Sequence, residues 1–383
     1  MLVSATPAVA QRPGASLDVQ AAMVADSVSG GQAASAHGGG NGGWFLRSDA
    51  SGSGGRARLT WRLDGSSQVR RAPGSGEANW DQQSANAAVI LRSTRVTTLG
   101  VNGAARWSPR YSVGLPQPDG AGNTAAPAIE VPGLNSVTAR IGGRLTRALT
   151  RVRSADTEYT LERVAAAGRT IVTQRAAAGL KQQLDPLFSL GLAQSVTRRR
   201  STGVGSAGAN TSFETTVALT RRVGKTTSFT AAVIPSFFMP DASARDGAAI
   251  FHLGGGATVE RRWSAGWRTT LAAQQSLLSG EGYATPVYAR SIGGSAAGRL
   301  GPVSVTGTAS WIVGGRAADG SRGPGGQSVS VAASRPLTRR VALAAEYQHA
   351  RVQRAALAPA GPAATHLANR RLRLAVTVPV SRH

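Results

Sequence analysis

The sequence predicts an all-β protein, a closed up-and-down antiparallel transmembrane β-barrel of about 16 strands, in a range of 14 to 18. Segments of about ten residues alternate apolar and polar side chains along most of the 383 residues. Short and long connections alternate between these segments. Finally, the apolar faces are rich in Ala, Val and Gly rather than in the dense Ile, Leu and Phe of a soluble core.

The first alternating segment is "GRARLTWRLDG", residues 55–65. Successive side chains of a β-strand point to opposite faces. If this stretch is one strand, Arg56, Arg58 and Arg62 share one face, whereas Trp61 and the leucines beside it share the other. The stretch therefore predicts a strand with a cationic side and an apolar side.

Later segments show the same period of two. In 303–313, Val305 and Trp311 fall on one face, and Thr306 and Ser310 fall on the other. A strand over the last segment presents leucines and valines on one side and Arg371 and Arg373 on the other. Further strands of this kind are predicted over 134–145, 212–220, 328–333, 340–348 and 370–380.

The connections predict an up-and-down order. Seven short turns from residue 107 onward define fourteen strands, the last segment adds one, and 43–106 adds a few more. Short turns are predicted near 107–110, 146–149, 182–186, 222–225, 262–266, 299–301 and 336–339. Long connections are predicted near 116–133, 198–210, 237–247, 279–286, 314–325 and 354–368.

The composition predicts three regions along the chain. Residues 1–10 resemble the end of a signal peptide, because Ala8-Val9-Ala10 before Gln11 fits a small-residue cleavage site. Residues 11–42 are rich in Gly, Ala and Ser and are expected to form a flexible lead-in. The barrel is expected to occupy residues 43–383.

Other architectures fit less well. A solenoid requires a fixed short repeat, which the sequence lacks. No run approaches the roughly 18 apolar residues of a transmembrane helix. A closed barrel explains many half-polar strands without a dense core, because its lumen is wet and its sheet has no free edge.

The formal net charge is +24, from 43 Lys and Arg against 19 Asp and Glu. The basic residues are spread along the chain instead of forming a tail, and the longest basic run is only Arg198-Arg199-Arg200. Aromatic residues for base stacking are few, at 5%. Nucleic acid is therefore not an expected partner.

Catalytic and cofactor motifs are absent from the sequence. There is no cysteine, and the five histidines have no metal-ligand spacing. No phosphate-binding loop or calcium loop is present. A pairing of His252 with Ser276 or Glu260 is conceivable, but serine is too common for this to predict an enzyme. We expect no enzymatic activity, cofactor or metal.

Across about residues 43–383 the chain resembles bacterial outer-membrane β-barrel proteins of the porin-like kind, with no subfamily identified. The resemblance rests on the alternating segments, on the basic tight turns "LTRRVGKTTSF", "RPLTRRVAL" and "VERRWSAGW", and on the amphipathic last strand. It implies location in the bacterial outer membrane. Outer-membrane lipid, lipopolysaccharide and the assembly machinery are then partners, and assembly into homo-oligomers is left open.

The resemblance implies a channel for passive passage of solutes. Strand parity predicts arginines in the lumen, and rings of arginine favour anions in a pore. Small anionic solutes, or an acidic polysaccharide being exported, are the expected cargo. The alternative is a non-conducting barrel with a structural or surface-interaction role. The candidate pore-lining residues are Arg56, Arg58, Arg62, Arg140, Arg144, Arg268, Arg371 and Arg373.

Overall fold

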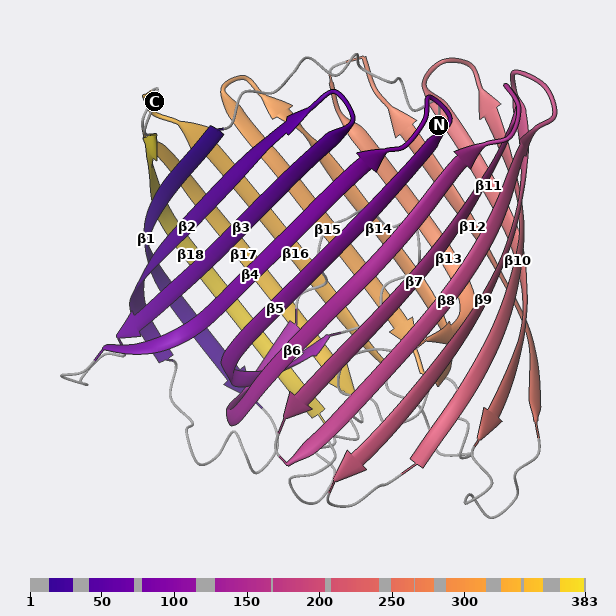
Figure 1. The fold of residues 1–383 in the computed structure, drawn as a ribbon. Helices are drawn as coiled ribbons and strands as arrows, with labels where there is room; N and C mark the ends of the chain where they lie inside the picture. Colours follow the sequence, from indigo (N-terminus) through magenta and orange to yellow (C-terminus); the bar gives the residue numbers. More distant parts are fainter. Residues whose placement is uncertain are drawn as a thin grey trace.

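The computed structural model forms one antiparallel sheet of eighteen strands (Figure 1). No helix among the described residues is both long and apolar enough to span a membrane. The structure describes residues 14–29, 41–71, 78–114, 128–166, 168–203, 208–240, 249–264, 266–278, 287–314, 325–338, 341–353 and 366–381.

The strands follow the chain in order around the sheet. The first nine are β1 Gly14–Ser29, β2 Asn41–Arg56, β3 Leu59–Arg71, β4 Ala78–Arg92, β5 Thr97–Gly114, β6 Ala128–Ala148, β7 Arg153–Ala166, β8 Arg169–Gln183 and β9 Phe188–Gly203. The others are β10 Gly208–Val223, β11 Thr227–Pro240, β12 Ile250–Arg262, β13 Arg268–Leu278, β14 Val287–Leu300, β15 Val303–Val313, β16 Gly325–Pro336, β17 Ala342–Gln353 and β18 His366–Ser381.

The sheet closes on itself. Each strand pairs antiparallel with the strands before and after it in the chain, and β1 pairs with β18 from Ser16↔Ser381 to Ser29↔Ala368. Closure removes the free edges and satisfies the backbone groups of every strand within the sheet. The predicted all-β, up-and-down antiparallel fold is confirmed, with a strand number at the upper limit of the predicted range.

The first strand corrects the expected domain boundaries. β1 lies inside residues 11–42, which the composition had suggested to be flexible. The segment does alternate, with Leu17, Val19, Ala21 and Met23 at every second position. It is stabilised as a strand by pairing on both sides, with β18 and β2. The expected signal-peptide remnant, 1–10, lies outside the described residues.

The connections at one edge of the barrel, at the top of Figure 1 where β1 begins and β18 ends, are all short. At the opposite edge only the β7–β8 and β9–β10 connections are comparably short. Glycine residues and side-chain hydrogen bonds stabilise the turns at the top edge. Gly224 and Gly301 have φ of 67° and 59°, a region that glycine enters without steric cost. In the β8–β9 turn, Asp185 Oδ1 accepts the backbone N–H of Leu187 at 2.6 Å and of Phe188 at 2.7 Å. Six of the seven predicted turns lie at or beside these connections.

The seventh predicted turn, at 107–110, is wrong. These residues lie within β5, where the register with β6 shifts between Ser108 and Arg110. Such a bulge bends a strand and strengthens its local twist. Beyond it the two strands stay paired to Gly114↔Ala128.

The prediction of a single strand over 55–65 is also wrong. β2 ends at Arg56, residues 57–58 form a two-residue hairpin turn, and β3 begins at Leu59. Alternation continues across the turn in the sequence, so that the period alone does not reveal the break.

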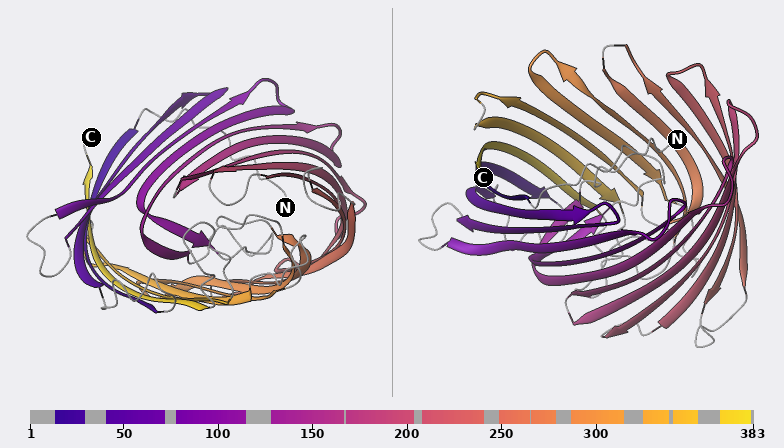
Figure 2. Two further views of the ribbon diagram at one scale, coloured as in Figure 1. Left: turned by 90° about the horizontal axis from the view of Figure 1, so that it is seen from below. Right: turned by 45° about the horizontal axis from the view of Figure 1, so that its top comes forward.

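The bend in the β5–β6 hairpin carries its far end into the barrel. β6 is bonded to β5 and β7 in the wall, yet it also approaches β17 and β18 on the opposite side of the ring. Figure 2, left, shows the end of β5 and the start of β6 inside the ring. The lumen is therefore partly crossed by a hairpin of its own wall.

The outer face of the strands forms an apolar belt. Large side chains at alternate positions are strongly exposed, among them Trp311 at 62% and Leu253 at 61%. All the acidic side chains described in the strands lie on the opposite, inner face. They include Asp81, which lies at a bulge and accepts a hydrogen bond from the inward Gln68. Such a belt, polar inside and apolar outside, is the pattern of a membrane-spanning barrel.

Two glycines in neighbouring strands test how tightly the belt is packed at its short-turn edge. A Cβ at Gly298 would overlap the indole of Trp267, whereas a Cβ at Gly307 would meet nothing closer than Ser330 O at 3.8 Å. We expect Gly298→Ala to destabilise the folded barrel by about 1–3 kcal/mol, the usual effect of overpacking. Heat-modifiable gel migration measures this. Gly307→Ala is the control, and equal melting of the two variants would contradict the packing.

Candidate functional site

The candidate site is the inner face of the barrel, and the strand registers define it. Directly opposed residues of paired strands share a face. Starting from Asp64, the same face carries Ser51 on β2 and Asn86 on β4, and the assignment continues strand by strand around the closed ring. This face is polar and hydrogen-bonded along most of its circumference.

Six of the eight predicted pore-lining arginines belong to this inner parity, and two do not. Arg56 is opposite the outward-facing Leu59, at the last position of β2, so it lies on the belt side at the short-turn edge. Arg58 is in the hairpin turn. The six at the inner parity are Arg62, Arg140, Arg144, Arg268, Arg371 and Arg373.

Several of these arginines have acidic partners. Arg62 Nε lies 2.8 Å from Asp64 Oδ2. Arg268 Nη2 lies 3.0 Å from Glu260 Oε2. Two longer pairs, Arg144–Asp156 at 3.7 Å and Arg373–Glu346 at 3.8 Å, join adjacent strands. Acidic side chains therefore accompany the arginines on the inner face.

Two further acids are opposite arginines in the register of β6 and β7: Glu162 is opposite Arg140, and Glu158 is opposite Arg144.

The inner face nevertheless carries more basic than acidic groups. Arg175, which the sequence analysis missed, is exposed on the inner side of β8 and is opposite Thr160 and Thr197. The inner basic residues are Arg47, Arg62, Arg70, Arg92, Arg106, Arg140, Arg144, Arg169, Arg175, Lys181, Arg199, Arg222, Arg262, Arg268, Arg299, Arg371 and Arg373. The inner acids are Asp49, Asp64, Asp81, Asp156, Glu158, Glu162, Glu214, Glu260 and Glu346.

Part of the wall is lined by hydroxyl groups instead of charges. Ser310 and Ser328 share a hydrogen bond of 2.6 Å between β15 and β16, and Thr308 and Ser330 share another of 2.6 Å. Both pairs follow the predicted parity of 303–313. Charge in the lumen is therefore unevenly distributed, with a neutral polar sector on these strands.

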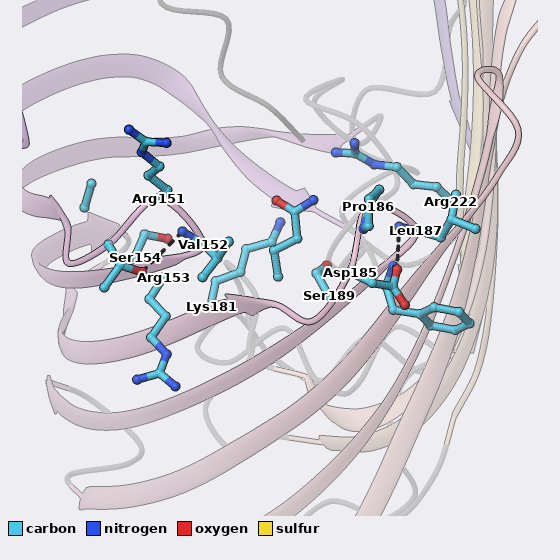
Figure 3. A pocket seen from close by; sticks show the side chains of 14 residues that line it. Arg151, Val152, Arg153, Ser154, Lys181, Asp185, Pro186, Leu187, Ser189 and Arg222 are labelled. Carbon is cyan, nitrogen blue, oxygen red and sulfur yellow. Dashed lines mark hydrogen bonds between the residues drawn. The ribbon is translucent and has the colours of Figure 1, made fainter.

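A recess of about 210 Å³ opens at the short-turn mouth, between the β6–β7 and β8–β9 turns (Figure 3). Its inner-parity residues include Lys181 and Arg222, and its one acid, Asp185, already accepts two backbone N–H groups. Arg151 and Arg153 point in opposite directions in Figure 3. The cations do not converge on one point, so the recess is a basic part of the mouth rather than a closed binding site.

The conceivable catalytic pairing is not assembled. His252 stacks on Tyr288 with ring centroids 4.3 Å apart. Ser276 is buried and accepts a hydrogen bond from Gln274. Glu260 is eight residues from His252 on the same strand, about 26 Å away at the rise of a β-strand. Among the described residues, no group of three or more histidines and acids could hold a metal ion.

Known structures share this fold. No protein-family model matches the chain, and no curated protein sequence matches it. OccAB4 of Acinetobacter baumannii has 11% identity and a TM-score of 0.50, with 97% of this chain and 99% of that chain covered. OpdO of Pseudomonas aeruginosa has 11% identity and a TM-score of 0.51, with 96% and 98% covered. The FrpB iron transporter of Neisseria meningitidis, F5-1 variant, has 9% identity and a TM-score of 0.51, with 97% and 83% covered.

The fold is thus that of a porin-like outer-membrane β-barrel, as the sequence predicted. A closed ring with an apolar outer belt requires a bilayer. The bilayer in which such barrels reside is the bacterial outer membrane. The short-turn edge then faces the periplasm, and the opposite edge of the barrel faces the outside.

Cysteine labelling tests the assignment of the two faces. In membranes, a water-soluble thiol reagent should label Thr306→Cys through the lumen but not Ala309→Cys, although both positions are exposed in the bare protein. Lipid covers only the outer face, so the difference should vanish in the denatured protein. Equal labelling of both variants in intact membranes would refute the assigned parity.

Proposed function

We propose that the protein is an outer-membrane channel for passive diffusion of small solutes, with a moderate preference for anions. The observation that carries this proposal is a closed ring with a charged, hydrogen-bonded inner face and an apolar outer face. A polar interior of this kind suits water and ions, because the lumen of such a barrel can be filled with water. The channel fold of the similar structures supports the same function.

The preference for anions follows from the excess of basic over acidic groups on the inner face. The ion pairs limit it, because Asp64, Glu260 and their equivalents neutralise much of the positive charge locally. Salt limits it further, since the screening length is about 8 Å at physiological ionic strength. We therefore expect a moderate selectivity that weakens as salt rises.

The β5–β6 hairpin sets an upper limit on solute size. Its backbone enters the ring and approaches β17 and β18, so the free cross-section is smaller than that of the ring itself. Small anions such as carboxylates fit this description better than a polysaccharide does. Arg371 and Arg373 lie on the strand that the hairpin approaches.

Planar-bilayer recordings with variants on two adjacent strands, β6 and β7, test the charge argument. Arg140→Gln with Arg144→Gln removes two inner cations and should shift the reversal potential in a chloride gradient toward cation preference. Glu158→Gln with Glu162→Gln removes two opposed acids and should shift it the other way. The physical reason is that fixed charge in a wet pore attracts counter-ions and repels co-ions.

Arg163→Gln is the matched control, because Arg163 follows Glu162 in the chain but points to the outer face. This variant should leave the reversal potential unchanged. Conductance without a shift in either double variant would exclude these residues from the pore. No conductance at any voltage in the folded wild type would instead favour the non-conducting alternative.

A further inference from the structure

The outer face carries charge of one sign only. Among the described strand residues of the outer parity there are arginines but no aspartate or glutamate, and the arginines lie toward the strand ends. At the short-turn edge they are Arg56, Arg147, Arg153, Arg221, Arg261 and Arg335. At the long-connection edge they are Arg71, Arg163, Arg198, Arg200, Arg290, Arg351 and Arg370.

Three arginines of the second edge form a compact group, here called the β7–β9 patch: Arg163, Arg198 and Arg200. Arg163 on β7 is opposite Val172 on β8, and Val172 is opposite Arg200 on β9. At the strand spacing of a β-sheet, the Cα atoms of Arg163 and Arg200 are about 10 Å apart. Arg198 lies two residues from Arg200 on the same face.

The longest basic run of the sequence, Arg198-Arg199-Arg200, is divided between the two faces of β9. Because side chains alternate, Arg199 points inward and is only 6% exposed, whereas Arg198 and Arg200 point outward and are exposed. The patch arginines form no hydrogen bond or ion pair with any described residue. Glu162, which precedes Arg163 in the chain, points to the inner face. Three guanidinium groups therefore face outward without a partner among the described residues.

Two arginines of the other edge differ in this respect. Arg221 lies over the ring of Phe188 at 5.4 Å, and Arg261 lies over that of Trp263 at 3.9 Å. A cation over an aromatic ring is already partly stabilised within the protein. The β7–β9 patch has no such ring contact in the part of the chain that the structure describes, which leaves its charge available to a partner from the surroundings.

We propose that the β7–β9 patch binds the phosphate groups of an anionic glycolipid in the outer leaflet, of the lipid A type. The patch lies on the belt side, at the edge that faces the outside of the cell. A guanidinium binds phosphate through paired, charge-assisted hydrogen bonds. Lipid phosphates are held at this depth of the membrane, next to the strand ends. The inference goes beyond the channel function and does not depend on conduction.

The experiment titrates the detergent-solubilised barrel with bisphosphorylated lipid A and counts bound lipid by native mass spectrometry. Arg163→Gln/Arg198→Gln/Arg200→Gln should weaken lipid A binding about tenfold to a hundredfold, as expected for three basic groups near an anionic surface. Dephosphorylated lipid A should bind both proteins equally weakly. Inorganic phosphate should not displace lipid A, because a free phosphate lacks the acyl chains that lie along the belt.

The control is Arg147→Gln/Arg153→Gln/Arg221→Gln, which removes three outer arginines from the other edge and should leave lipid A binding unchanged. Heat-modifiable migration confirms that each variant is folded, and the Lys version of the patch should retain part of the affinity. Undiminished binding to the folded Gln variant, or equal loss in the control, would overturn the proposal. Displacement by inorganic phosphate would identify a phosphate site in place of a lipid site.

Discussion

The pairing of β1 with β18 is the interaction on which the rest of the molecule depends. In a bilayer an unpaired backbone N–H or C=O group costs several kcal/mol, so a sheet that spans it must have no edge. Every strand here has two neighbours, and the last of these pairings joins the two ends of the chain. β1 has no strong strand signature of its own, since it is rich in Ala and short in bulky β-branched residues. It becomes a strand because two partners satisfy its backbone on both sides.

Closure also fixes the parity of every side chain. A slip of one residue in any strand would exchange its lumen and belt faces and would bring acids such as Glu158 and Glu162 to the lipid. All acids of the described strands stay on the inner side, while arginines occur on both. The difference has a physical reason: the long aliphatic stem of arginine can cover apolar surface while its head reaches the interface, and a short carboxylate cannot do this. The high net charge of the chain thus has two origins, the lumen and the two rims of the belt.

Much of the fold was predictable because period two and tight turns are local properties of the sequence. The parity of 303–313 and of the last strand is an example. The alternation of polar and apolar residues gave a wrong prediction at the β2–β3 turn, because it continues through the turn. Residues 57–58 contain neither Gly nor Pro, so the sequence placed Arg56, Arg58 and Arg62 on one face of a single strand. The ion pairs likewise include some that the local sequence indicates and others that it does not. Arg62–Asp64 joins residues two apart on one strand and was visible in the sequence, whereas Arg144–Asp156 and Arg373–Glu346 depend on registers between strands. The path of the β5–β6 hairpin depends on a bulge and on strands more than two hundred residues away.

A guanidinium group placed in or beside a membrane needs an anion, and this protein supplies it in different ways at different depths. In the lumen the partners are carboxylates on the same or the next strand, as for Arg268 with Glu260, and water solvates what remains. This arrangement holds the inner arginines in place and lowers the net field that a passing ion meets. At the short-turn edge, aromatic rings take part of that role. At the opposite edge the β7–β9 patch has neither acid nor ring beside it among the described residues, and we propose that the membrane neutralises its charge. Under the two proposals, arginines of the inner face tune permeation and arginines of the outer face bind the bilayer. The pleat alone divides neighbouring residues such as Arg199 and Arg200 between the two faces.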